Sequence, residues 1–257
     1  MPGHDGEPIG RDRATRSRNA PPRPQRPRKD DAPARPALPD EEPLLPRAVR
    51  KEIDRVLGPG PRARDVALCL SIASQALEEE RPDIALEVLV WARHQAPRLA
   101  LVREAYGAAL YQAERWADAL AELQGYRRLT GRTDQNHLIA DCLRALGRGI
   151  EQVADAAEPL VADPQAPEDR RAEAAIVWAA ALADAGDIGA GRAVVRRFLE
   201  RPRSGDAEHD LRVRYVAADL AEQAGDRDEA RRQLELIAAI AGDFLDVAER
   251  LDAVTDG

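Results

Sequence analysis

The fold of this chain is decided by two stretches of sequence, ASQALEEERPDIALEVLVWARHQAP at residues 73–97 and GAALYQAERWADALAELQGYRRLTG at residues 107–131. The second stretch repeats the first at an offset of 34 residues. Matching positions hold a small residue, an alanine, a leucine and a helix-ending residue: Ala73 and Gly107, Ala85 and Ala119, Leu89 and Leu123, Pro97 and Gly131. This period is typical of helix–turn–helix repeats that stack on one another.

Helical apolar spacing continues on both sides of these two repeats. Aromatic residues make up only 4% of the chain, and strand-like alternation of apolar and polar residues is absent. We therefore expect an all-α, right-handed α-solenoid of about five helix–turn–helix repeats behind a disordered N-terminal tail. The predicted organisation is a tail at 1–42, a helical repeat domain at 43–257 with a leading helix at 43–57, repeats at about 66–99, 100–133, 134–167, 172–205 and 211–244, and a capping helix at 244–254.

The segment from about 66 to 244 resembles the tetratricopeptide-repeat (TPR) family, best in the first two repeats. The family pattern has a small residue in the first helix, an aromatic residue entering the second, and an alanine followed four residues later by an apolar residue. Gly107, Trp116, Ala119 and Leu123 match it. The small residues matter because the two helices of a hairpin cross closely there.

Two later repeats depart from this pattern. In the third, Asp141 and Val153 occupy positions where small residues are expected, and in the fourth Gly191 replaces the alanine. We expect Gly191 to be tolerated at the cost of a weaker helix. The turn glycines of the last two repeats, Gly186 and Gly225, lie 39 residues apart, so an insertion of about five residues separates these repeats.

The first 42 residues hold nine prolines and few large apolar side chains. Between residues 11 and 36, nine basic side chains oppose three acidic ones. This net charge of +6 leaves −14 for the rest of a chain whose total is −8. Such a segment buries too little apolar surface to offset its ordering entropy, so we expect it to be disordered.

The sequence contains none of the common catalytic or nucleotide-binding motifs, so we predict a protein that is not an enzyme and has no cofactor. Cys69 and Cys142 lie far apart within helical patterns, and we expect both to be reduced core residues. None of the four histidines has a second ligand at metal-binding spacing. Without an apolar stretch long enough for a membrane or a secretion signal, we expect a cytoplasmic protein of bacterial type.

The family resemblance implies that the first helix of each repeat lines a concave face that receives a peptide or helix of another protein. Tyr111 and Tyr215 are the expected anchors, although either could instead pack between hairpins. The groove has mixed or acidic character, which favours a basic or amphipathic partner segment. Carried onto this sequence, the face comprises Leu70, Ser74, Leu77, Glu104, Ala108, Tyr111, Gln112, Gln135 or Asn136, Leu138, Ile176, Ala180, Arg212, Tyr215, Asp219 and Glu222.

The basic tail supports an alternative in which the protein is a regulatory adaptor tethered to nucleic acid. Arginine side chains neutralise phosphates and release counterions. Against this alternative, the tail has no aromatic residue to stack on bases, and the acidic body would repel the polymer. The arginine-for-lysine bias extends over the whole chain, 36 of 38 basic residues, so by itself it marks no site. The sequence leaves the partner and the oligomeric state open.

Overall fold

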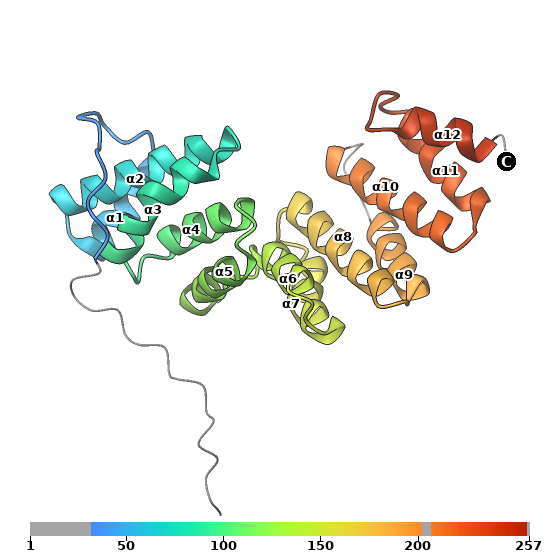
Figure 1. Ribbon diagram of the computed structural model, residues 1–257, viewed down its shortest axis with the longest axis horizontal. Coiled ribbons are helices and arrows are strands. Elements are labelled where there is room, and N and C mark those ends of the chain that lie inside the picture. Colours follow the sequence, from blue (N-terminus) through green and yellow to red (C-terminus); the bar gives the residue numbers. More distant parts are fainter. Residues whose placement is uncertain (1–31, 202–206, 256–257) are drawn as a thin grey trace, which may run out of the picture. The chain divides into compact units, whose positions relative to one another are not determined.

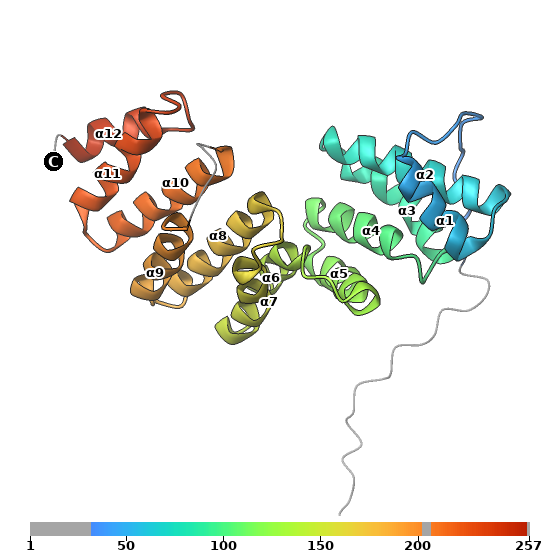
Figure 2. The ribbon, with the colours of Figure 1, turned by 180° about the vertical axis from the view of Figure 1, so that it is seen from behind.

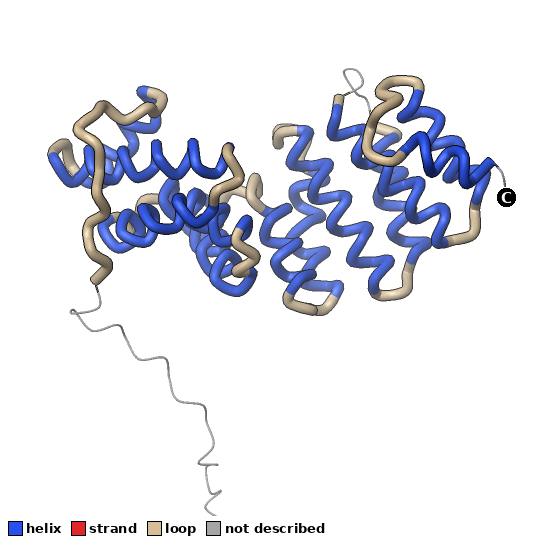
Figure 3. Tube along the Cα trace, turned by 45° about the horizontal axis from the view of Figure 1, so that its top comes forward, coloured by secondary structure: helices blue, strands red, loops and turns tan. Residues whose placement is uncertain are grey.

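The computed structural model describes residues 32–201 and 207–255, and this part of the chain is all-helical (Figures 1 and 3). The predicted disorder of the tail concerns mostly residues 1–31, which lie outside the described residues. The helices are α1 (Arg47–Leu57), α2 (Pro61–Glu78), α3 (Pro82–Gln95), α4 (Ala100–Gln112), α5 (Trp116–Thr130), α6 (Asn136–Ala145), α7 (Ile150–Ala162), α8 (Glu168–Asp184), α9 (Ile188–Leu199), α10 (Glu208–Gln223), α11 (Arg227–Ala238) and α12 (Val247–Thr255).

Within the described residues, five helical hairpins follow one another, and Figures 1 and 2 show them in this order from opposite sides. The hairpins are α2–α3, α4–α5, α6–α7, α8–α9 and α10–α11, and in each the two helices pack closely together. The first helix of each hairpin also contacts the first helix of the next, sparsely between α4 and α6 and more extensively from α6 onward. The expected α-solenoid is confirmed, with α1 and α12 packed at its two ends.

Small buried residues lie where the helices of a hairpin cross. The pairs are Ala73 and Ala85, Gly107 and Ala119, Ala179 and Gly191, and Ala218 and Ala230. A methyl group added at Gly191 would lie 2.8 Å from the carbonyl oxygen of Ala179. Gly191 is therefore more than a tolerated weak position, because the close approach of α9 to the backbone of α8 requires a residue without a Cβ atom.

The third hairpin accommodates its two larger residues in different ways. Val153 is fully buried in the core, whereas Asp141 is half-buried and accepts a hydrogen bond from the hydroxyl of Tyr111 at 2.7 Å. The side chain of Asp141 is thus directed at the preceding hairpin. A position that is small elsewhere serves here as a polar link between hairpins.

An extended segment at 33–46, which we call the N-terminal strap, precedes α1 and packs on α2. Arg35 forms a two-pronged ion pair with Asp65 at 2.7 and 2.8 Å, Leu38 packs on the core, and the backbone N–H of Leu44 donates to the hydroxyl of Ser71. These contacts lie partly on the tail side of the predicted boundary at residue 42. They form because Leu38 and the buried Pro43 supply apolar surface that the tail before them lacks.

Candidate functional site: a groove over α1, α2 and α4

A groove of about 450 Å³ lies over α1, α2 and α4, and we call it the first-helix groove. Leucine side chains and Val49 supply its apolar lining, and small or polar residues complete it. Ser74 and Ala108 occupy equivalent positions 34 residues apart, and their short side chains leave the groove open between α2 and α4. The lining residues are Leu45, Val49, Leu70, Ser74, Leu77, Leu101, Glu104, Ala105, Ala108, Gln135 and Arg170.

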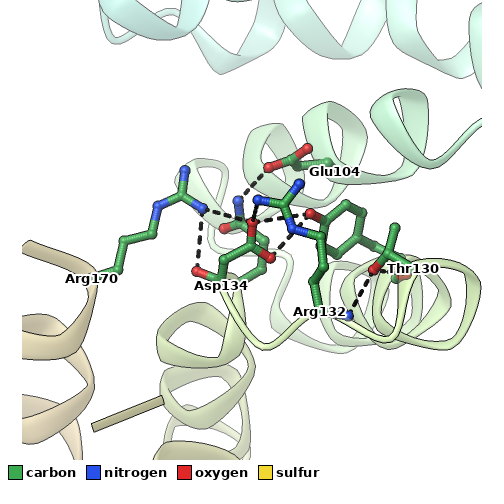
Figure 4. Close-up of polar contacts among 7 residues, drawn as sticks. Glu104, Thr130, Arg132, Asp134 and Arg170 are labelled. Atoms are coloured by element: carbon green, nitrogen blue, oxygen red, sulfur yellow. Dashed lines mark hydrogen bonds and ion pairs between the residues drawn. The ribbon is translucent and has the colours of Figure 1, made fainter. Parts of the chain in front are cut away.

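One end of the groove is polar and is built around the connection between α5 and α6 (Figure 4). Glu104 of α4 accepts a hydrogen bond from the side-chain amide of Gln135. The neighbouring Asp134 is buried and forms ion pairs with Arg132 at 2.5 Å and Arg170 at 3.4 Å. Arg170 belongs to α8, so this cluster connects the second, third and fourth hairpins.

A buried tyrosine, Tyr126, fixes the carboxylate of Asp134. The hydroxyl of Tyr126 donates to both carboxylate oxygens of Asp134, at 3.0 and 3.2 Å. Burial, followed by the charges of Glu104 and Asp134, raises the pKa of Tyr126. Tyr126 therefore stays protonated and remains a donor, and the carboxylate is fixed beside Arg170.

The electrostatics of the groove centre on Glu104. Burial raises the pKa of Glu104, and the charge of Asp134 raises it further, while the hydrogen bond from Gln135 and the charge of Arg170 lower it. Desolvation is the largest cause. A cation that enters the groove would favour the ionised form of Glu104, so binding of a basic group and ionisation of this carboxyl are coupled.

Five of the predicted site residues meet in this groove: Leu70, Ser74, Leu77, Glu104 and Ala108. The prediction that Asn136 lies on the groove face needs correction. Asn136 is fully buried, and its side-chain amide donates to the carbonyl of Ala156 inside the third hairpin. The other residue considered at that point, Gln135, lines the groove.

The two expected tyrosine anchors are engaged in contacts within the chain. Tyr111 bonds Asp141 and stands edge-on to Trp116 at a centroid distance of 5.2 Å. Tyr215 donates to Asp246 at 2.7 Å and packs edge-on to Phe244. Both tyrosines therefore connect neighbouring elements.

The remaining predicted residues lie on α4, α6, α8 and α10, outside the residues that line this groove. Gln112 at the end of α4 is exposed and donates to the carbonyl of Leu77, and the half-buried Ile176 packs in the core beside α9. Arg212 pairs with Glu173 at 3.0 Å. Asp219 and Glu222 both face Arg250 of α12, at 3.9 and 2.9 Å.

Sequence reasoning missed the contributions of α1 and α8. Leu45 of the N-terminal strap and Val49 of α1 both fall in the predicted leading helix at 43–57, which was not part of the predicted face, although its apolar spacing is visible in the sequence. Arg170 lies near the start of α8, before the predicted start of the fourth repeat at 172. No signal in the sequence links it to Glu104, because 66 residues separate them.

Comparisons with known proteins identify the fold. No family model and no curated protein matches the sequence. The structure is similar to a thermophilic TPR protein of Thermus thermophilus, with 17% identity, a TM-score of 0.53, and 73% of this chain and 97% of the other covered. The chain has the TPR fold. PilF of Pseudomonas aeruginosa is similar with the same identity and TM-score, over 73% of this chain and 82% of PilF.

The described residues of this TPR array contain two free cysteines and neither a membrane-spanning helix nor a metal-binding cluster. None of its described helices is both long and apolar enough to cross a membrane. Within the same residues, no group of three histidine, cysteine or acidic side chains is arranged to hold a metal ion. Cys69 and Cys142 are both free and buried, and burial raises the pKa of each thiol to about 12.

Proposed function

We propose that this TPR array is a non-catalytic scaffold that holds a peptide or helix of another protein in the first-helix groove. The observation that carries the proposal is the open leucine-lined channel that the small residues Ser74 and Ala108 leave between α2 and α4. Apolar side chains of a partner would replace water on Leu70, Leu77 and Leu101.

The polar end of the groove supports a preference for a basic or amphipathic segment. Glu104 lies in the groove with its pKa raised by burial, so a lysine or arginine of the partner would stabilise its ionised form. Arg170 is already paired with Asp134, and this pairing limits its capacity for an acidic partner. The preferred ligand therefore combines apolar anchors with one basic side chain near Glu104.

The proposal is tested with a photo-crosslinking residue placed at the exposed Ser74 of the full-length protein. After irradiation in native lysate, crosslinked partners are identified by mass spectrometry. Ala108→Arg would block the groove at the neighbouring position and should abolish the crosslinks. Ala117→Arg, on the exposed face of α5, is the matched control and should leave them unchanged. The same products with both variants would exclude the groove as the binding surface.

The nucleic-acid alternative depends on arginines at 11–28, which lie outside the described residues. It predicts that exchanging these arginines for glutamine removes bound nucleic acid and leaves the Ser74 crosslinks unaffected. A steep loss of nucleic acid with rising salt in the parent protein, together with no Ser74 crosslink to any protein, would favour this alternative over the groove.

A further inference from the structure

Helix α9 lies between two cavities, both of which carry arginine. The first has a volume of about 490 Å³ and is lined by α9, α10 and α11. It holds Arg192 and Arg196 of α9, Arg214 of α10 and Arg232 of α11, against Glu200 and Glu229. In a chain with a net charge of −8, this cavity is locally basic.

The second cavity, of about 360 Å³, is lined by α7, α8 and α9 and combines apolar and basic groups. Val161, Trp178, Val194 and Phe198 form its apolar part. Arg171, Arg197 and Arg201 supply three further guanidinium groups, opposed by Glu158 alone. We call the two cavities together the α9 surface; its lining contains seven arginines and three glutamates, and two further carboxylates, Asp226 and Asp210, pair with Arg192 and Arg201 from outside the lining.

Several of these arginines retain binding capacity. Arg196 approaches Glu200 only at 3.9 Å, and both side chains are largely exposed. Among the described residues no ion pair holds Arg197. Arg201 is more constrained, because its guanidinium pairs with the buried Asp210 at 3.4 Å and lies over the ring of Phe198 at 3.2 Å, and only its buried Nε lacks a hydrogen-bond partner within the described part of the chain. An exposed pair such as Arg196–Glu200 contributes little to stability, so exchanging it for a ligand's carboxylate costs little.

The arginines and the apolar side chains of the α9 surface together indicate the chemistry of its ligand. The exposed guanidinium groups of Arg196 and Arg197 favour carboxylates, which arginine binds in a two-pronged geometry, while the other five arginines already contact groups of the chain. The apolar part beside Trp178 and Phe198 offers nothing to a phosphate backbone but fits a large apolar side chain. We propose that the α9 surface binds an acidic segment of a partner protein, with an aromatic or leucine side chain inserted beside Trp178 and carboxylates on the arginines of α9.

This surface is separate from the first-helix groove. The groove is built on α1, α2 and α4 with Gln135 and Arg170, whereas the α9 surface uses α7 to α11. Figure 1 shows α9 beside α8, away from α1 and α2. The chain would therefore hold two ligands of opposite chemistry at once, a basic or amphipathic segment in the groove and an acidic segment on α9.

The test uses the full-length protein and a fluorescently labelled peptide rich in aspartate and glutamate with one central tryptophan, measured by fluorescence anisotropy. Arg196→Glu combined with Arg197→Glu should weaken binding by about tenfold or more, because two attractive charges become repulsive. The matched control is Arg127→Glu with Arg128→Glu, at the same place in the last turn of α5. Both variants keep the basic tail, so attraction by the tail cancels in the comparison.

A second pair of variants tests the apolar part of the site. Ala193 is exposed and lines the second cavity, so Ala193→Gln should fill it and weaken the tryptophan peptide severalfold, while the exposed Ala121→Gln on α5 should not. A peptide with serine in place of tryptophan should bind several times more weakly to the parent protein. Equal loss with the α5 and α9 charge variants would overturn the proposal. So would tighter binding of a single-stranded oligonucleotide that Arg196→Glu with Arg197→Glu abolishes.

Discussion

The first two hairpins and the last two make the same turn with different residues. In each, the residue after the turn donates its N–H to the carbonyl five residues earlier, as from Arg115 to Leu110 and from Asp226 to Ala221, both at 2.9 Å. This bond requires a left-handed residue at the turn. Glu80 and Glu114 adopt it with φ of 56°, whereas Gly186 and Gly225 supply it at 88° and 74°.

The first two hairpins and the last two also differ in the residue that caps the start of their second helix. Asp187 and Asp226 cap α9 and α11 by accepting hydrogen bonds from the backbone N–H of Ala190 and Glu229. At α3 and α5 the capping position is an arginine that makes no side-chain cap. The repeats with the clearest 34-residue pattern thus have the less favourable turns. Their conformation depends on core packing, while the last two hairpins carry strong local signals of their own.

The largest effect is expected from Gly107→Leu, because this substitution disrupts the core packing on which the first two hairpins depend. Even a Cβ atom at this position would lie 2.8 Å from Cγ and Cδ2 of the buried Leu123. A leucine should destabilise the protein by about 3 kcal/mol and unfold at least the first two hairpins. Urea unfolding and hydrogen exchange of α2 to α5 measure this, with the exposed Ala117→Leu as control. A variant that melts like the parent would show that this crossing tolerates a large side chain.

The second largest effect is expected from Gly191→Ala in the fourth hairpin. Because the added methyl group meets the carbonyl oxygen of Ala179, backbone must move, and we expect a loss of about 1–3 kcal/mol despite alanine's higher helix propensity. Gly189→Ala, two residues away on α9, meets only a carboxylate oxygen at 3.7 Å and should gain up to about 1 kcal/mol. Thermal unfolding of both variants measures the contrast. If both Gly191→Ala and Gly189→Ala stabilise the protein, then α9 does not approach the backbone of α8 closely at Gly191.

A smaller effect comes from exchanging the turn residues between the two regions. Glu114→Gly should stabilise the second hairpin by somewhat less than about 1 kcal/mol, because the left-handed strain is removed but the unfolded chain gains freedom. Gly225→Glu should destabilise the fifth hairpin by about 1 kcal/mol for the reverse reason. Denaturant unfolding measures both. Shifts of the same sign would mean that turn chemistry does not distinguish the two regions.

The smallest effect is a pH dependence at the cap of α11. The hydrogen bond from Arg192 and the backbone N–H of Glu229 lower the pKa of Asp226 below its usual range. Its stabilising contribution is therefore present above about pH 4 and is lost as the pH falls through the lowered pKa. Asp226→Asn should be less stable than the parent at pH 7, and this difference should shrink in acid. Asp187→Asn controls for the exchange itself. A difference that grows with acidity would contradict this.

The hairpins were predictable because their signal is local and periodic. The segments that carry the 34-residue offset form the hairpins α2–α3 and α4–α5, and the turns at Gly186 and Gly225 join α8 to α9 and α10 to α11. The N-terminal strap was not predictable, because extended chain that packs through Arg35 and Leu38 has no periodic pattern. Its partners lie about 30 residues away, on a helix whose start at Pro61 also precedes the predicted repeat.

The candidate site was only partly predictable, because neighbouring residues on a helix point about 100° apart. At the start of α6 the sequence could not decide between Gln135 and Asn136, and only the first lies in the groove. The arginines of α9 were hidden for another reason. Arginine replaces lysine throughout the chain, so its frequency does not single out any position in the sequence. Only the folded structure shows that Arg171, Arg197 and Arg214 lie around α9.

The N-terminal strap also bears on how such an array can change length in evolution. Duplicating the first or second hairpin would insert a unit that matches its neighbour at the small positions Ala73 and Gly107, and Ala85 and Ala119, which lie 34 residues apart. A unit added ahead of α2 would have to displace Arg35 from Asp65 and Leu38 from the core. A hairpin inserted between existing hairpins would leave these contacts of the strap intact, whereas one added ahead of α2 would break them.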